Sequence, residues 1–123
     1  KTGGGAIVNT ASSLGQVAIP RASEYVAAKH GVIGLTRAAG ADFAARGVRV
    51  NAVLPGIIRT PMIARLSENP DFAGMFDALR ARHPIGRFGE PSEVGEAVTW
   101  LLSDKASFMN GAAVAVDGGY LSI

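Results

Sequence analysis

Three short apolar runs alternate with longer helical patterns along this chain of 123 residues, and this alternation constrains the fold more than any other feature. The runs cover residues 6–10, 48–54 and 112–116. They are too short for stable helices, and turn residues such as Pro55-Gly56 bound them. Apolar strands that alternate with helices are typical of a parallel sheet covered on both faces. We therefore predict an α/β fold, in one domain because the chain is too short for two.

The longest helical pattern spans residues 23–46. Ser23 is expected to cap its start, and Gly47 stands where a left-handed glycine ends a helix. Its interior carries Gly31, Gly34 and Gly40. Each interior glycine costs about 1 kcal/mol relative to alanine, so close packing has to compensate. We therefore expect this helix to be buried on two sides, against the sheet and against another helix.

Residues 57–87 look irregular, apart from one amphipathic stripe. Phe72, Met75, Phe76 and Leu79 recur at helical spacing and predict one helix of about three turns. Pro91 fits the first turn of a further helix, and apolar residues continue at helical spacing from Val94 to Leu102.

Charge and composition exclude several functional classes. The net charge is only +2 and Lys and Arg form no run, so we do not expect nucleic-acid binding. The chain has no cysteine and two histidines, which excludes disulfides and makes a metal site improbable. No apolar run approaches the roughly 18 residues of a membrane span. The cytoplasm is the default expectation, and because the chain begins at Lys1 we expect a preceding segment.

Several chemically capable residues are expected at one edge of the sheet. Tyr25 and Lys29 stand four residues apart on a predicted helix and therefore share a face, a pairing that is common on helix surfaces. Ser12 follows the first predicted strand and Pro55-Gly56 ends the second. Ligands of open parallel sheets bind at the carboxyl ends of the strands. These neighbours make the Tyr–Lys pair a candidate active site.

Five stretches carry a family resemblance: IVNTASSLG, YVAAK, RVNAVLPGIIRTPM, HPIGRFGEPSEV and VAVDGG. In this order the chain resembles the short-chain dehydrogenase/reductase family, especially members such as 3-oxoacyl-carrier-protein reductases and glucose dehydrogenases. The resemblance implies the C-terminal part of a doubly wound parallel-sheet, Rossmann-like three-layer sandwich. Residues 1–123 would then form a single partial domain without the N-terminal dinucleotide-binding half, because no TGxxxGxG turn is present.

The same resemblance implies roles for individual residues. Tyr25 matches the general acid/base, and Lys29 matches the partner that favours the phenolate and binds the nicotinamide ribose. A serine is implied to polarise the substrate carbonyl. Ser12 is preferred over Ser13 because its 13-residue spacing to Tyr25 matches the family. The loop implied to contact the nicotinamide contains Pro55, Gly56, Ile58 and Thr60.

Elementary electrostatics support the paired roles of tyrosine and lysine. A phenol ordinarily has a pKa of about 10, too high for a base at neutral pH. An ammonium about 4 Å away, at an effective dielectric constant near 20, favours a phenolate by about 4 kcal/mol. The reaction that the family resemblance implies is hydride transfer between NAD or NADP and a small-molecule ketone or secondary alcohol.

Other expectations concern the whole protein. The resemblance implies a homotetramer, with interfaces on helix 23–46 and the last strand. It also implies that residues 57–87 shape substrate specificity, and that the apolar stripe within them either covers the substrate pocket or belongs to the core; the stripe consists of Phe72, Met75, Phe76 and Leu79. His30 and His83 are expected to be structural or surface residues, with substrate contact the lesser alternative for His83. Three strands alone would expose an edge that favours aggregation. The competing hypothesis is a truncated, catalytically silent product that acts at most as an interaction module.

Overall fold

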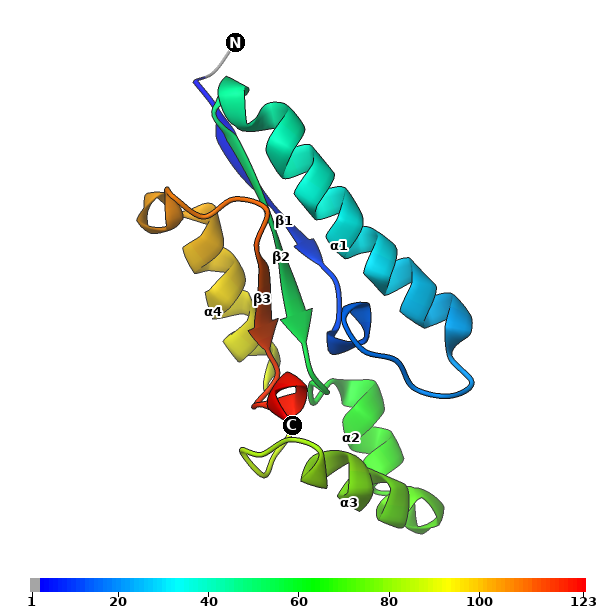
Figure 1. Ribbon diagram of the computed structural model, residues 1–123. Coiled ribbons are helices and arrows are strands. Elements are labelled where there is room, and N and C mark those ends of the chain that lie inside the picture. The colour runs from blue at the N-terminus through cyan, green and yellow to red at the C-terminus, as the bar shows by residue number, and fades with distance from the viewer. Residues whose placement is uncertain (1–2) are drawn as a thin grey trace.

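A computed structural model describes residues 3–123 as one parallel sheet with helices on both faces. Its main elements are β1 (Gly5–Thr10), α1 (Ser23–Phe43), β2 (Val48–Pro55), α2 (Pro61–Ser67), α3 (Ala73–Ala81), α4 (Pro91–Leu102) and β3 (Ala113–Val116). The strand order is β1-β2-β3, with Gly5 opposite Val48 and Ala52 opposite Ala113. Figure 1 shows α1 and α4 on opposite sides of the sheet. The predicted α/β three-layer arrangement is confirmed.

Strand β2 lies in the centre of the sheet, and this position explains why polar and apolar residues do not alternate along its sequence. Residues from Val50 to Leu54 are all buried, since both faces of β2 are covered. Leu54 joins Ile33 of α1 in one core cluster. Val53 points to the other face and joins Leu101 of α4 in a second. The carboxyl ends of all three strands consequently meet at one edge.

The ends of α1 agree only in part with the prediction. Gly47 has a φ of 77° and ends the turn that follows the helix, as predicted. Ser23, however, is the first helical residue, and Ala22 takes the cap position without a side-chain hydrogen bond. The prediction for Ser23 was wrong because the Val26 N–H already bonds the Ala22 carbonyl, at 2.9 Å.

The packing of α1 is also confirmed on one side only. At Gly40 an added Cβ would lie 2.9 Å from Asn110 Oδ1, so the helix backbone approaches the loop before β3 closely. Within residues 3–123, a Cβ added at Gly31 or Gly34 would meet nothing within 4 Å apart from the adjacent backbone of α1, and Leu35 is 62% exposed. Packing of the outer face of α1 against another helix therefore stays a prediction.

The segment 57–87 contains more regular structure than its sequence indicates. The predicted amphipathic helix is α3, with Phe76 buried, but Phe72 lies just before it and Met75 is exposed. Helix α2 was not predicted. It begins where the Thr60 hydroxyl accepts a hydrogen bond from the Ile63 N–H at 3.3 Å, with Pro61 in its first turn. Helix α4 begins at Pro91 as predicted.

Candidate active site

Tyr25 and Lys29 share one face of α1, as their spacing predicts. The Lys29 Nζ lies 5.5 Å from the centre of the Tyr25 ring. It also donates a hydrogen bond to the Thr10 carbonyl oxygen, at 3.3 Å, at the carboxyl end of β1. The Tyr25 side chain is about half exposed. The lysine therefore connects α1 to the edge of the sheet and brings its positive charge close to the phenol.

The two candidate serines have different environments. Ser13 is 3% exposed, and its hydroxyl donates to the Pro55 carbonyl oxygen at 3.2 Å. Ser12 Oγ accepts a hydrogen bond from the Leu14 N–H at 3.1 Å, which caps the 3₁₀ turn Ser13–Gly15. No hydrogen bond among residues 3–123 uses the hydroxyl proton of Ser12. Ser13 thus joins two loops, whereas the Ser12 proton remains available to a ligand.

A cavity of about 260 Å³ brings most of the predicted site residues together. Its polar part includes Ser12, Tyr25 and the Pro55-Gly56 backbone. Its apolar wall is formed by Leu14, Ile19, Ile57 and Leu79. Ser13 and Tyr120 complete the lining. The cavity lies at the carboxyl ends of β1 and β2, the edge at which open parallel sheets bind their ligands.

The remaining predicted loop residues lie beyond this cavity. Ile58 forms an isolated parallel bridge with Gly89, and Thr60 caps α2. The Ile58 carbonyl oxygen accepts from the Thr60 N–H at 2.8 Å. Within the described part of the chain, no hydrogen bond uses the Ile58 N–H. The structure therefore groups Pro55 and Gly56 with the serine and tyrosine, and leaves a backbone donor at Ile58.

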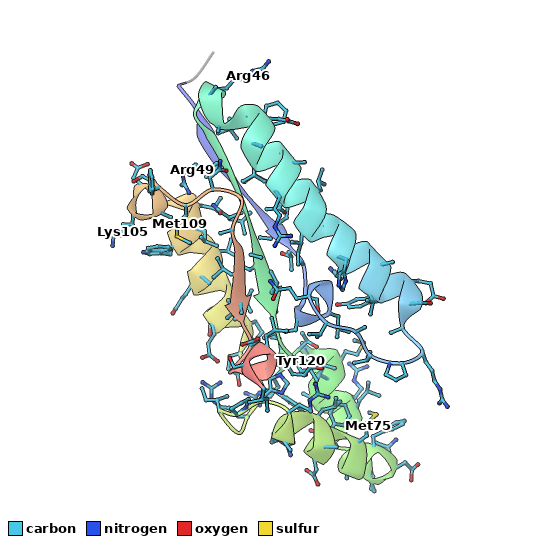
Figure 2. All side chains as sticks on the ribbon, in the orientation of Figure 1. Arg46, Arg49, Met75, Lys105, Met109 and Tyr120 are labelled. Atoms are coloured by element: carbon cyan, nitrogen blue, oxygen red, sulfur yellow. The ribbon has the colours of Figure 1, made fainter. Side chains whose placement is uncertain are left out.

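Sequence reasoning missed Tyr120 as a lining residue. It is 7% exposed and lies in the short turn after β3, at the same sheet edge as the other site residues. Figure 2 shows it at the carboxyl end of the strands, on the side of α2 and α3. The rule that located Ser12 and Pro55 applies equally to the residues after β3, so the signal was present in the sequence.

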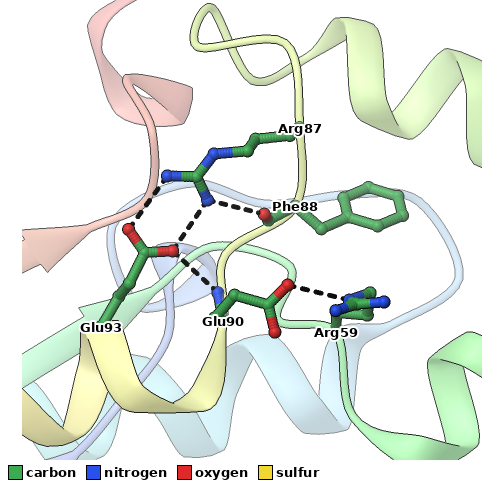
Figure 3. Close-up of polar contacts among 5 residues, drawn as sticks. All are labelled: Arg59, Arg87, Phe88, Glu90 and Glu93. Carbon is green, nitrogen blue, oxygen red and sulfur yellow. Dashed lines mark hydrogen bonds and ion pairs between the residues drawn. The ribbon is translucent and has the colours of Figure 1, made fainter.

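Charged side chains at the start of α4 form a compact network, drawn in Figure 3. The Arg87 guanidinium donates to both carboxylate oxygens of Glu93, at 2.7 and 3.0 Å. Glu93 also accepts from the Glu90 N–H at 2.9 Å. The Arg87 hydrogen bond and this backbone donor lower the pKa of Glu93 to about 2. Arg59 pairs with the Glu90 carboxylate at 2.9 Å.

A larger cavity of about 350 Å³ lies beside that network and includes Arg87, Glu93 and Val116 in its lining. Its cation, Arg87, is already paired with Glu93, and its second carboxylate, Asp117, accepts hydrogen bonds from the backbone N–H groups of Gly119 and Leu121. The cavity contains neither Tyr25 nor the two serines. We therefore place the candidate active site in the smaller cavity. Over residues 3–123, no helix has the length and hydropathy of a membrane span, and no cluster of side chains suits a metal ion.

The family and the relatives that match this chain are described as reductases and dehydrogenases. Residues 1–121 match a family described as enoyl-(acyl carrier protein) reductase. The chain is 54% identical, over 119 residues, to 2,5-dichloro-2,5-cyclohexadiene-1,4-diol dehydrogenase of Sphingobium indicum. It is 53% identical, over 120 residues, to cyclohexanol dehydrogenase of an Acinetobacter species. These matches cover 97% and 98% of this chain, but 47% and 45% of the relatives. The chain thus spans about half the length of these curated relatives.

A solved structure gives the same result for the fold. A putative 2-deoxy-D-gluconate 3-dehydrogenase from Agrobacterium tumefaciens, crystallised with NADP, superimposes with a TM-score of 0.91 at 38% identity. The match covers 98% of this chain and 48% of that protein. The arrangement of strands and helices around the candidate site is therefore shared with a dehydrogenase that binds a nicotinamide cofactor.

Proposed function

Because the chain belongs to the short-chain dehydrogenase/reductase family, we propose that it carries the reaction centre of an NAD- or NADP-dependent oxidoreductase. The reaction is hydride transfer between the cofactor and a ketone or secondary alcohol. One observation carries the proposal: Ser12, Tyr25 and Pro55-Gly56 line one cavity, with the Lys29 ammonium 5.5 Å from the tyrosine ring. In this proposal residues 1–123 are the C-terminal, catalytic part of one domain, and residues outside them hold most of the cofactor.

The polar groups at this edge fit a nicotinamide and its ribose. When bound, the cofactor supplies or accepts the hydride. An ammonium has three donors, and Lys29 uses one on Thr10, so it can also bind a ribose hydroxyl. The unused N–H of Ile58 suits a carboxamide oxygen. Pro55, Gly56 and Thr60 are assigned to the same loop contact by the family resemblance.

The proton of the reaction is assigned to Tyr25. During reduction, the Tyr25 hydroxyl donates its proton to the substrate oxygen, and during oxidation the phenolate takes the proton back. The Lys29 ammonium, 5.5 Å from the centre of the Tyr25 ring, supplies a positive charge beside the group that exchanges the proton. The Ser12 hydroxyl donates a hydrogen bond to the same substrate oxygen and stabilises the negative charge that develops there.

The apolar wall of the cavity favours a substrate with a compact hydrocarbon body. Leu14, Ile19 and Ile57 offer no hydrogen-bonding side chains to a sugar. The names of two relatives refer to ring alcohols, a cyclohexadienediol and cyclohexanol. We therefore propose a cyclic secondary alcohol, or the corresponding ketone, as the substrate class.

The exposed apolar side chains support the proposed homotetramer. Leu35 on the outer face of α1 is 62% exposed, and Trp100 on α4 is 45% exposed. Large exposed apolar patches commonly mark interfaces between proteins. The exposure of Leu35 is consistent with the interface that the family resemblance assigns to α1, whereas Trp100 lies outside the two assigned interfaces.

The acid/base assignment is tested in the complete gene product with Tyr25→Phe. We expect kcat for cyclohexanol oxidation to fall by about 10²–10⁴-fold, because the proton acceptor is removed. The dissociation constant of the reduced cofactor, measured by its fluorescence, should change by less than about twofold. Turnover that survives Tyr25→Phe would disprove the role of this residue.

Serine variants provide the matched control within the same assay. Ser12→Ala should lower kcat by about 10²-fold or more, because a donor to the developing oxyanion is lost. Ser13→Ala should mainly lower the melting temperature, because its buried bond to Pro55 is lost. The reverse result would assign the polarising role to Ser13. Faster turnover of gluconate than of cyclohexanol would contradict the proposed substrate class.

A further inference from the structure

His83 is buried and uses both ring nitrogens. The residue is 2% exposed and lies just after the end of α3. Nδ1 lies 2.9 Å from the Leu79 carbonyl oxygen, and Nε2 lies 3.0 Å from the Ile57 amide nitrogen. A carbonyl oxygen only accepts, and a backbone N–H only donates. Nδ1 therefore carries the proton and Nε2 is the acceptor.

The imidazole is held in this orientation by its neighbours. Phe88 packs edge-on against it, with ring centres 5.8 Å apart, and Tyr120 lies at 5.2 Å. Gly56 faces the ring so closely that an added Cβ would lie 2.8 Å from His83 Nε2 and 3.0 Å from the Asp117 Cα. The ring thus cannot turn away from the Gly56-Ile57 backbone without displacing an aromatic neighbour.

The loop after β2 is held in place from three directions. The Gly56 N–H donates to the Val116 carbonyl of β3 at 3.0 Å. The Ile57 carbonyl accepts from the Gly89 N–H at 2.9 Å. His83 supplies the third restraint, the acceptor for the Ile57 N–H. Of these three restraints, only the one from His83 comes from a side chain. His83 lies in the segment between α3 and α4.

The same imidazole also reaches the substrate side of the cavity. Its second hydrogen bond ends on Leu79, whose side chain is part of the apolar wall. One side chain therefore connects the loop assigned to the nicotinamide with the helix end that shapes the substrate pocket. The sequence favours a structural role for His83, with substrate contact as the lesser alternative.

We infer that His83 is a positioning residue for the reaction, an inference that rests on the proposed function. Through Nε2 it sets the position of the Gly56-Ile57 backbone against the nicotinamide, and through Nδ1 it sets the position of Leu79 against the substrate. The two bonds predict two separable effects, one on cofactor affinity and one on the KM of the substrate.

Two amide variants separate these bonds in the complete gene product. In His83→Asn, the side-chain NH₂ takes the place of Nδ1–H and can donate to Leu79, but Ile57 loses its acceptor. In His83→Gln, the side-chain oxygen reaches the place of Nε2 and can accept from Ile57, but the bond to Leu79 is lost. The variants remove one hydrogen bond each, so a merely structural role predicts similar losses for both.

The expected results differ in kind between the two variants. His83→Asn should weaken cofactor binding by roughly tenfold, because a buried donor loses its partner. His83→Gln should keep the cofactor dissociation constant within about twofold of the wild type and raise the substrate KM several-fold. Equal weakening of cofactor binding in both variants, or none in His83→Asn, would overturn the inference. If His83→Asn does not fold, a cofactor affinity in His83→Gln more than tenfold below wild type overturns it.

Hydrogen–deuterium exchange supplies a readout that needs neither turnover nor cofactor. The Ile57 amide should exchange faster in His83→Asn and stay protected in His83→Gln. Faster exchange in both variants, or in neither, would show that His83 does not hold the loop. A wild type that binds neither NAD nor NADP would instead disprove the proposed function, and the exchange pattern would still decide whether His83 positions the Ile57 backbone.

Discussion

At the scale of single residues, Glu93 shows how local contacts keep a carboxylate ionised at a helix start. It lies in the first turn of α4, where a negative charge interacts favourably with the helix dipole. The hydrogen bonds from Arg87, and next the backbone N–H of Glu90, lower its pKa to about 2 from an ordinary value of 4.5. Its side chain is 42% exposed, so water and salt weaken the pair.

This pKa predicts the acid side of the stability profile. The pKa of Glu93 is lower in the folded protein, so its contribution is present above pH 4.5 and is lost as the pH falls towards about 2. The stability difference between wild type and Glu93→Gln, measured by urea unfolding, should therefore shrink between pH 5 and pH 2. Glu96→Gln, on the same helix, is the control. A Glu93 carboxyl that titrates near 4.5 by NMR would contradict the prediction.

At the scale of elements, Asn110 joins α1 to the sheet. Its Nδ2 donates to the Gly40 carbonyl at 2.8 Å, and its Oδ1 accepts from the Val50 N–H at 3.0 Å. These two hydrogen bonds require the backbone of α1 at Gly40 to lie close to the loop before β3. At Gly40 an added Cβ would meet Asn110 Oδ1 at 2.9 Å and the Gly111 nitrogen at 3.2 Å. The loop before β3 therefore requires glycine at this point of the helix.

The cost of a methyl group there is testable. Gly40→Ala should lower the free energy of unfolding by about 1–3 kcal/mol, because the clash exceeds the gain of about 1 kcal/mol in helix propensity. Gly74→Ala in α3 is the matched control, since nothing lies within 4 Å of its added Cβ. It should leave stability unchanged or raise it by up to about 1 kcal/mol. Denaturant unfolding of both variants measures the difference, and a stabilising Gly40→Ala would refute the argument.

A second connection between elements involves Arg49 of β2. Its guanidinium donates to the carbonyl oxygens of Leu101 and Ser103, both at 3.0 Å, and of Met109 at 3.3 Å. Figure 2 places Arg49 and Met109 together at the end of the sheet remote from Tyr120. A cation at a helix C-terminus satisfies carbonyls that have no partner within the helix. Arg49 thus holds α4 against the sheet from the end opposite the candidate active site.

At the scale of the whole molecule, the sheet has an open edge. Within residues 3–123, β1 pairs only with β2, and Ile7 of β1 is 50% exposed on an apolar strand. An exposed edge strand offers unpaired backbone groups to other chains. The outer faces of α1 and α4 add exposed apolar side chains such as Leu35 and Trp100.

These surfaces predict different behaviour for the 123 residues alone and for the proposed longer protein in which they form the catalytic part. The 123 residues alone should self-associate, and Ile7→Lys should reduce that association, because a charge on an edge strand opposes pairing. The complete gene product should elute as a tetramer. Size-exclusion chromatography with light scattering distinguishes these states. A monodisperse monomer of the isolated chain with a cooperative melt would contradict the prediction.

The sequence predicted most elements because their signals are local. The runs of β1, β2 and β3 were located to within one residue at each end, since buried strands are continuous and apolar. The face shared by Tyr25 and Lys29 follows from the helical period alone. Helix α2 was missed because its seven residues are too few for a clear periodic pattern. The N-cap of α1 was placed one residue late, at Ser23 instead of Ala22, because Ser23 resembles a cap in sequence.

By itself, then, the sequence determined the order of strands and helices and the residue types at one sheet edge, since both depend on neighbours along the chain. Only the tertiary structure decided which serine is bonded to Pro55 and which backbone groups the buried His83 binds. The bonds to Pro55 and to the Ile57 N–H join residues 42 and 26 positions apart. Their partners are selected by how the layers pack, because a buried polar atom must find its hydrogen bond in the folded neighbourhood.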